Sequence, residues 1–132
     1  MIGLDTNILI RYLTQDNQIL SPKATALIER HLLPESPGFI SVVTMAEVAW
    51  VLDSYYSLSS SEIADGIERI LSADMFIVER EQQVFTAMML LRKGAADFAD
   101  ALIGLLAQRA GCSHTLTFDR KASRLPGFEL LS

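Results

Sequence analysis

Residues 1–13 read MIGLDTNILIRYL and carry the pattern that decides the fold. The first four residues form an apolar run of strand length, and the polar residues Asp5, Thr6 and Asn7 follow directly. The next six residues, 8–13, have the composition of a helix. A short apolar strand that turns straight into a helix is typical of a parallel β-sheet covered by helices.

The rest of the 132-residue chain repeats this alternation of short strands and helices. We expect further strands at residues 39–40, 75–78, 115–118 and 128–131. Helices are expected at about 21–31, 41–55, 61–71, 81–92 and 97–111, with starts at Ser21-Pro22, at Ser41 or Thr44, at Ser61 and at Asp97. The strands are uniformly apolar rather than alternating in polarity. The sequence therefore predicts an α/β fold in which a short parallel sheet has helices on both faces, in a single domain spanning residues 1–132.

Composition narrows the class of protein. Half of the residues are hydrophobic and 20% are charged, which excludes intrinsic disorder, and the net charge of −5 argues against a broad basic surface for nucleic acid. The single cysteine, Cys112, cannot form an intrachain disulfide and is expected to be a small core residue. No run reaches the ~18 apolar residues of a membrane span, and no signal-peptide pattern opens the chain. We expect a cytoplasmic protein with no membrane attachment.

Carboxylates at strand ends and helix starts are the candidate functional residues. Asp5 and Asp119 each follow a predicted strand at its carboxyl end, where α/β folds place their sites. Glu47 lies on a helix that is apolar nearly all round, so it is expected to be buried with a partner. Asp100 shares a helix stripe with small and apolar residues, whereas Asp97 is expected to be the helix cap.

Each of these acids also has a structural explanation. Asp5 and Asp97 suit helix N-caps, Glu47 fits a capping box with Thr44, and Asp119 suits a turn. Together, however, converging carboxylates would repel one another unless a cation neutralised them. Such all-oxygen ligands favour Mg²⁺ or Mn²⁺.

The chain resembles the PIN domain, and within it the VapC-like toxins of type II toxin–antitoxin modules. The resemblance rests on four stretches in order along the whole chain: residues 4–9 around Asp5, residues 41–52 around Glu47, residues 97–103 around Asp100, and residues 116–120 around Asp119.

The resemblance implies an endoribonuclease that depends on Mg²⁺ or Mn²⁺ and cuts structured RNA, either transfer RNA or ribosomal RNA. Asp5 and Asp100 would be its main metal ligands, and Glu47 and Asp119 would complete the catalytic set. The supporting residues would be Thr6, Asn7, Thr117 and Asp97. The resemblance also implies a homodimer and inhibition by a cognate antitoxin.

RNA binding by so acidic a chain would depend on local basic residues. Arginine suits phosphate contacts, and the candidates are Arg11, Arg109, Arg120, Lys121 and Arg124. A phosphatase of the haloacid dehalogenase type would need an aspartate at position 7, where this chain has Asn7. The alternative that remains is a PIN-like module that binds RNA or a protein without cutting.

Overall fold

A computed structural model describes all residues, 1–132, of the chain. The strands are β1 (Ile2–Gly3), β2 (Gly38–Ile40), β3 (Phe76–Val78), β4 (Thr115–Thr117) and β5 (Phe128–Leu130). The α-helices are α1 (Thr6–Thr14), α2 (Leu20–Ala26), α3 (Val42–Ser54), α4 (Ser60–Ser72), α5 (Glu81–Arg92) and α6 (Phe98–Arg109). The π-helical turn η1 (Leu27–His31) extends α2, and the 3-10 turn η2 (Ala122–Arg124) follows β4. The predicted order of strands and helices is confirmed, with ends that differ by a few residues.

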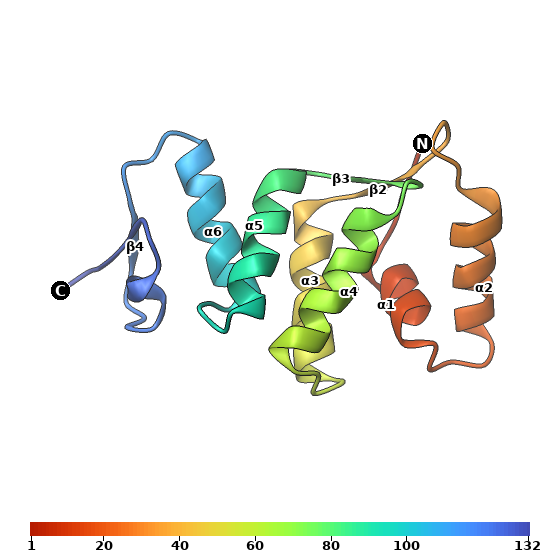
Figure 1. The fold of residues 1–132 in the computed structure, drawn as a ribbon, viewed down its shortest axis with the longest axis horizontal. Helices are drawn as coiled ribbons and strands as arrows, with labels where there is room; N and C mark the ends of the chain where they lie inside the picture. Colours follow the sequence, from red (N-terminus) through yellow and green to blue (C-terminus); the bar gives the residue numbers. More distant parts are fainter.

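The strands are all parallel, as predicted, but they form two sheets. One sheet has the order β1-β2-β3, and the other contains only β4 and β5. Figure 1 shows the β4–β5 pair at one end of the molecule, with α5 and α6 between it and the three-stranded sheet. The α/β class is therefore confirmed, whereas a single continuous sheet is not formed.

The core lies between the helices and the three-stranded sheet. Leu9 of α1, Ile40 of β2, Met45 of α3, Ile67 of α4 and Met88 of α5 are fully buried there. Burying one such side chain stabilises a fold by about 1.5–3 kcal/mol. This core fixes the first five helices around the sheet and so holds the ends of β1 and β2 in place.

The start of α4 is shifted from the expected residue, whereas the start of α3 agrees with one of its two expected residues. Helix α4 begins after Ser59, whose hydroxyl accepts from the Glu62 backbone N–H at 3.1 Å while the Glu62 side chain accepts from the Ser59 N–H at 3.0 Å. Ser61 was expected as the cap, but it lies inside the helix. Helix α3 starts after Ser41, which accepts from the Thr44 N–H, so Ser41 rather than Thr44 is its cap.

The start expected at Ser21-Pro22 is also wrong. The Asn17 side chain accepts from the backbone N–H groups of Ile19 and Leu20, and the helix begins at Leu20. Ser21 is buried, and its hydroxyl donates to the carbonyl oxygen of Arg11 at 2.8 Å. Ser21 is a residue type that suits an N-cap, but in the structure its hydroxyl joins α2 to α1 instead.

The C-terminal part of the chain is held by α6. Phe98, Ala101 and Leu102 are the buried residues of this helix, which packs against α5 and α3. A Cβ added to Gly104 would lie 2.3 Å from Cε2 of Phe128, so this glycine lets β5 approach α6. Cys112, expected in the core, is exposed instead. None of the helices has the length and apolar character needed to span a membrane.

Candidate active site

The first acidic group joins the end of β1 to α3. Asp5 caps α1, and its carboxylate accepts from the Thr6 backbone N–H at 2.7 Å. The Thr6 side chain is buried, and its hydroxyl donates to Oε1 of Glu47 at 2.6 Å. One threonine therefore contacts both carboxylates, through its backbone and through its side chain. These two hydrogen bonds join Asp5 to Glu47 through Thr6, whose supporting role in a catalytic site stays a prediction.

Glu47 differs from its expected setting. It is exposed rather than buried, and the partner expected for its carboxylate is the Thr6 hydroxyl group. Its predicted role in a capping box with Thr44 is wrong, because Ser41 caps α3. The helix is apolar on several sides, yet the position of Glu47 beside the end of β1 leaves its carboxylate open to solvent.

A cavity beside this group contains residues that sequence reasoning missed. Asp5, Thr6, Asn7 and Glu47 line it, together with Arg11, Asp16, Tyr55 and Tyr56. The hydroxyl of Tyr56 donates to Asp16 at 2.5 Å, and Arg11 pairs with the same carboxylate at 3.0 Å. These contacts, with Tyr56 first and the Thr14 hydroxyl next, lower the pKa of Asp16 from 3.8 to about 2.

Arg11 is held by this pairing. Its guanidinium contacts both Asp16 oxygens, which raises the pKa of Arg11 and fixes the group at the rim of the cavity. An arginine expected to bind RNA is thus bound to a carboxylate. No sequence motif marks Asp16 or Tyr56, because they are 40 residues apart and meet only in the folded chain.

The second acidic group lies at the start of α6 and in the loop after β4. Asp97 caps α6 by accepting from the Asp100 N–H at 3.2 Å, as predicted. Burial raises the pKa of Asp100 above its ordinary value of 3.8, and the charges of Asp97 and Asp119 raise it further. Lys121 acts in the opposite direction. The charges of Asp97 and Asp119 therefore both act on Asp100, with Lys121 as the nearby cation.

Asp119 is fixed by its own loop. Its carboxylate accepts from the backbone N–H groups of Lys121 at 2.8 Å and Ala122 at 3.2 Å. The hydroxyl of Thr117 accepts from the Asp119 N–H at 3.0 Å, so Thr117 positions the residue as a supporting side chain. The turn function expected for Asp119 is confirmed, and its remaining carboxylate oxygen has no hydrogen bond within the chain.

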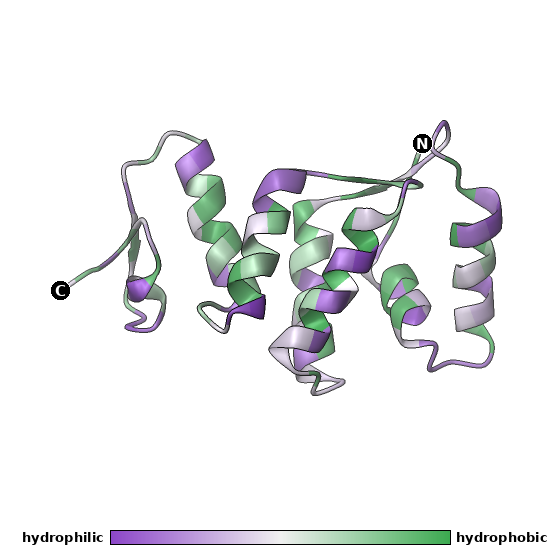
Figure 2. Cartoon of the chain, viewed as in Figure 1, coloured by the Kyte–Doolittle hydropathy of each residue, from purple (hydrophilic) through white to green (hydrophobic).

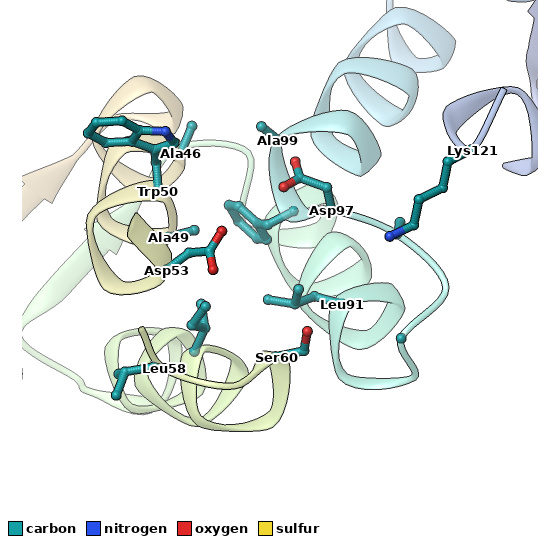
Figure 3. A pocket seen from close by; sticks show the side chains of 14 residues that line it. Ala46, Ala49, Trp50, Asp53, Leu58, Ser60, Leu91, Asp97, Ala99 and Lys121 are labelled. Carbon is teal, nitrogen blue, oxygen red and sulfur yellow. The ribbon is translucent and has the colours of Figure 1, made fainter. Parts of the chain in front are cut away.

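A separate pocket lies between α3, α4 and the start of α6 (Figure 3). Asp53 and Asp97 both point into it, and Trp50 and Lys121 lie on its rim. Asp53 was missed by sequence reasoning, although its spacing from Ala46 and Ala49 places all three on one face of α3. This pocket brings α6 and Lys121 close to the helix that carries Glu47.

The predicted acids are thus divided between two groups. Asp5 and Glu47 belong to the first group, whereas Asp97, Asp100 and Asp119 belong to the second. No three acidic, histidine or cysteine side chains come close enough together to hold a metal ion. The single pocket expected for Asp5, Glu47, Asp100 and Asp119 is not formed within this chain, because β4 has only β5 as a neighbour and does not also pair with β1.

The residue types still bear on metal binding. The carboxylate oxygens are the ligands that Mg²⁺ and Mn²⁺ prefer, and the two histidines lie elsewhere. His31 ends η1, and His114 pairs with Glu129 at 3.1 Å. The donor set therefore fits a divalent ion in chemistry, but its two halves are apart within one chain.

The remaining basic candidates occupy the C-terminal surface. Arg109 ends α6, and Arg120, Lys121 and Arg124 are exposed around Asp119. None of the four forms an ion pair with an acid within the chain, unlike Arg11. Arg120, Lys121 and Arg124 are available to contact phosphate groups near Asp119, whereas Arg109 lies at the opposite end of α6 from Asp97 and Asp100.

Comparison with known proteins gives one match. The family model described as "PIN domain" matches residues 2–127. No curated protein sequence and no solved structure matches the chain significantly. The matched segment includes every acid of both groups.

Proposed function

Because the chain belongs to the PIN domain family, whose members are generally nucleases, we propose that it is an endoribonuclease that requires Mg²⁺ or Mn²⁺. The observation that carries this proposal is the Asp5–Thr6–Glu47 arrangement at the carboxyl end of β1. Two carboxylates are held there by one buried threonine and remain open to solvent. Such a rigid acidic edge is suited to hold a cation against a phosphate.

The roles of the chain's residues follow from their contacts. Asp5 and Asp100 are proposed as the main ligands, with Glu47 and Asp119 completing the set. Thr6 orients Glu47, and Thr117 orients Asp119. A divalent ion bound by carboxylates supplies charge neutralisation at the phosphate and an activated water. Asn7 lines the same cavity as Asp5, and its amide is proposed to contact the substrate.

We further propose that the protein is the toxin of a type II toxin–antitoxin pair and acts in the cytoplasm on transfer RNA or ribosomal RNA. The exposed basic residues Arg120, Lys121 and Arg124 beside Asp119 support binding to a folded RNA. A cognate antitoxin would cover the acidic edge, and the toxin is proposed to be a homodimer. Growth arrest on induced expression, relieved by a co-expressed neighbouring reading frame, tests this part.

The direct experiment is an RNA cleavage assay on the purified protein. We expect cleavage of total RNA with Mn²⁺ or Mg²⁺ and none with EDTA. RNA that stays intact with either metal, while the protein still binds it, would favour the alternative function of a non-catalytic RNA-binding module. If the protein neither binds nor cleaves RNA, the result would favour the alternative function of a protein-binding module.

A further inference from the structure

Strands β1 and β4 each lie at an open edge of their sheet. β1 pairs with β2 alone and β4 with β5 alone, so each has one side without a neighbouring strand. The N–H groups of Ile2 and Leu4 donate toward β2, so alternation turns the N–H and carbonyl of Gly3 to the open side. In β4, Thr115 and Thr117 bond to β5, which turns Leu116 to its open side.

Large apolar side chains accompany these edges. Ile2 is 49% exposed, Leu116 is 55% exposed and Phe118 is 81% exposed. Figure 2 shows hydrophobic residues on the C-terminal strands, at the end of the molecule. Unpaired edges with exposed apolar side chains are sites where further strands add.

The unpaired backbone N–H and carbonyl groups of β1 and β4 are also spaced so that the two strands can pair in parallel. In a parallel ladder, Gly3 would bond to Leu116 and Phe118 when it lies opposite Thr117. The same register places Ile2 opposite Leu116. It also places Asp5 opposite Asp119, because each aspartate comes two residues after the end of its strand. Pairing of β1 with β4 would therefore bring the two acidic groups together.

Within one chain this pairing is blocked by distance. The helices α5 and α6 stand between the two sheets along the longest axis of the molecule (Figure 1). α6 is fixed to α5 and α3 by Phe98, Ala101 and Leu102, and to β5 by the Gly104–Phe128 contact. The C-terminal strands are therefore anchored on their own chain, with β4 facing outward.

We propose that β4 of a second copy of this chain pairs with β1, so that one active site is built from two subunits. The first subunit supplies Asp5 and Glu47, and the second supplies Asp100 and Asp119. The joined sheet has the order β3-β2-β1 followed by β4 and β5 of the partner subunit. When each subunit supplies both edges, the exchange is reciprocal and closes as a twofold dimer. This inference rests on the proposed function for the chemistry of the site.

The remaining open edges belong to β3 and β5, and β3 lacks a free carboxylate at its carboxyl end. Glu79 follows β3, but its carboxylate is already used, because it accepts from the Val42 backbone N–H at 3.0 Å. Ile77 of β3 is 47% exposed, close to the value for Ile2. β3 thus offers a matched control edge for the experiment.

The first test is a disulfide cross-link. In a Cys112→Ser background, Ile2→Cys is combined with Leu116→Cys, since neighbouring strands lie about 4.8 Å apart and a disulfide spans roughly 4.4–6.8 Å between Cα atoms. We expect a covalent dimer on a non-reducing gel after mild oxidation, and a dimeric mass for the wild type by light scattering. The control pair, Ile77→Cys with Leu116→Cys, should remain monomeric on the gel.

An Ile2–Leu116 disulfide within one chain, no disulfide, or equal dimer from the control pair would overturn the inference. This readout needs no nuclease activity, so it is independent of the proposed function. A cross-linked dimer that cleaves no RNA would leave the interface standing and count against the nuclease.

The second test mixes two inactive variants, Asp5→Asn and Asp119→Asn, refolded together. In a mixed dimer, one of the two sites contains only unchanged residues. Random assembly should then restore about a quarter of the wild-type cleavage rate, whereas each variant alone stays inactive. If the wild type cleaves RNA and the mixture stays inactive, each site is formed within one chain and the inference is wrong.

Discussion

Thr6 connects the two carboxylates at the end of β1. Thr6→Val keeps the shape of the side chain but removes the hydroxyl that donates to Glu47. We expect the free energy of unfolding to fall by about 1 kcal/mol and RNA cleavage to fall at least tenfold, because Glu47 loses its fixed position. Thermal melts and cleavage rates measure both effects. Thr6→Ser keeps the hydroxyl and should retain most of the activity; equal activity in Thr6→Val would contradict the positioning role.

Asp16 makes the stability of the protein sensitive to acid. Its pKa is about 2 in the folded protein and 3.8 ordinarily, so its contribution to stability is present above pH 3.8 and is lost as the pH falls toward 2. Tyr56→Phe removes the hydrogen bond that lowers this pKa most. We expect the pKa of Asp16 to rise toward its ordinary value, as measured by an NMR pH titration. An unchanged pKa would show that the Tyr56 contact is not formed in solution.

At the scale of the elements, helix α4 tests which serine acts as the N-cap: Ser59, as in the structure, or Ser61, as predicted from the sequence. Ser59→Ala removes the capping hydroxyl and should lower the free energy of unfolding by about 0.5–2 kcal/mol. Ser61→Ala changes an exposed serine within the helix and should have almost no effect. Urea unfolding of the two variants measures both values. The reverse ranking would mean that the helix starts at the residue chosen from the sequence.

The contact between α6 and β5 can be tested at its glycine. In Gly104→Ala the added methyl would meet the ring of Phe128, so we expect a loss of about 1–3 kcal/mol from overpacking. Gly66→Ala is the matched control: it lies in α4, where the nearest atom to an added Cβ is 3.6 Å away, and it should gain about 0.5–1 kcal/mol. A stabilised Gly104→Ala variant would show that β5 does not pack on α6.

The order of elements could be predicted because each signal is local. Apolar runs, glycines and capping residues mark most strands and helices within a few positions, and Asp97 was predicted as a cap on those grounds. The helix starts were predicted wrongly where a residue suits more than one structural role. Ser21 and Ser61 both suit caps, but the packing of α2 on α1 and the Ser59–Glu62 box decide where the helices start.

For the whole molecule, the pairing of strands that are distant along the chain could not be predicted from the sequence. Nothing local in residues 115–118 shows whether this strand pairs with β1 of the same chain as well as with β5. The sequence could nominate Asp5, Glu47, Asp100 and Asp119, because each follows a strand or lies at a helix start. It could not show that Thr6 joins only the first two, or that Asp100 and Asp119 lie with Asp97.

The central claim is that acids from both groups serve one metal-dependent nuclease. Its most direct test is Mn²⁺-dependent RNA cleavage by Asp5→Asn and Asp119→Asn, each assayed separately beside Asp74→Asn, which removes an exposed carboxylate in the turn before β3. We predict that both site variants melt like the wild type and cleave no RNA, because each site loses an anionic ligand, whereas Asp74→Asn cleaves normally. RNA cleavage at the wild-type rate by either the Asp5→Asn or the Asp119→Asn variant would contradict the claim.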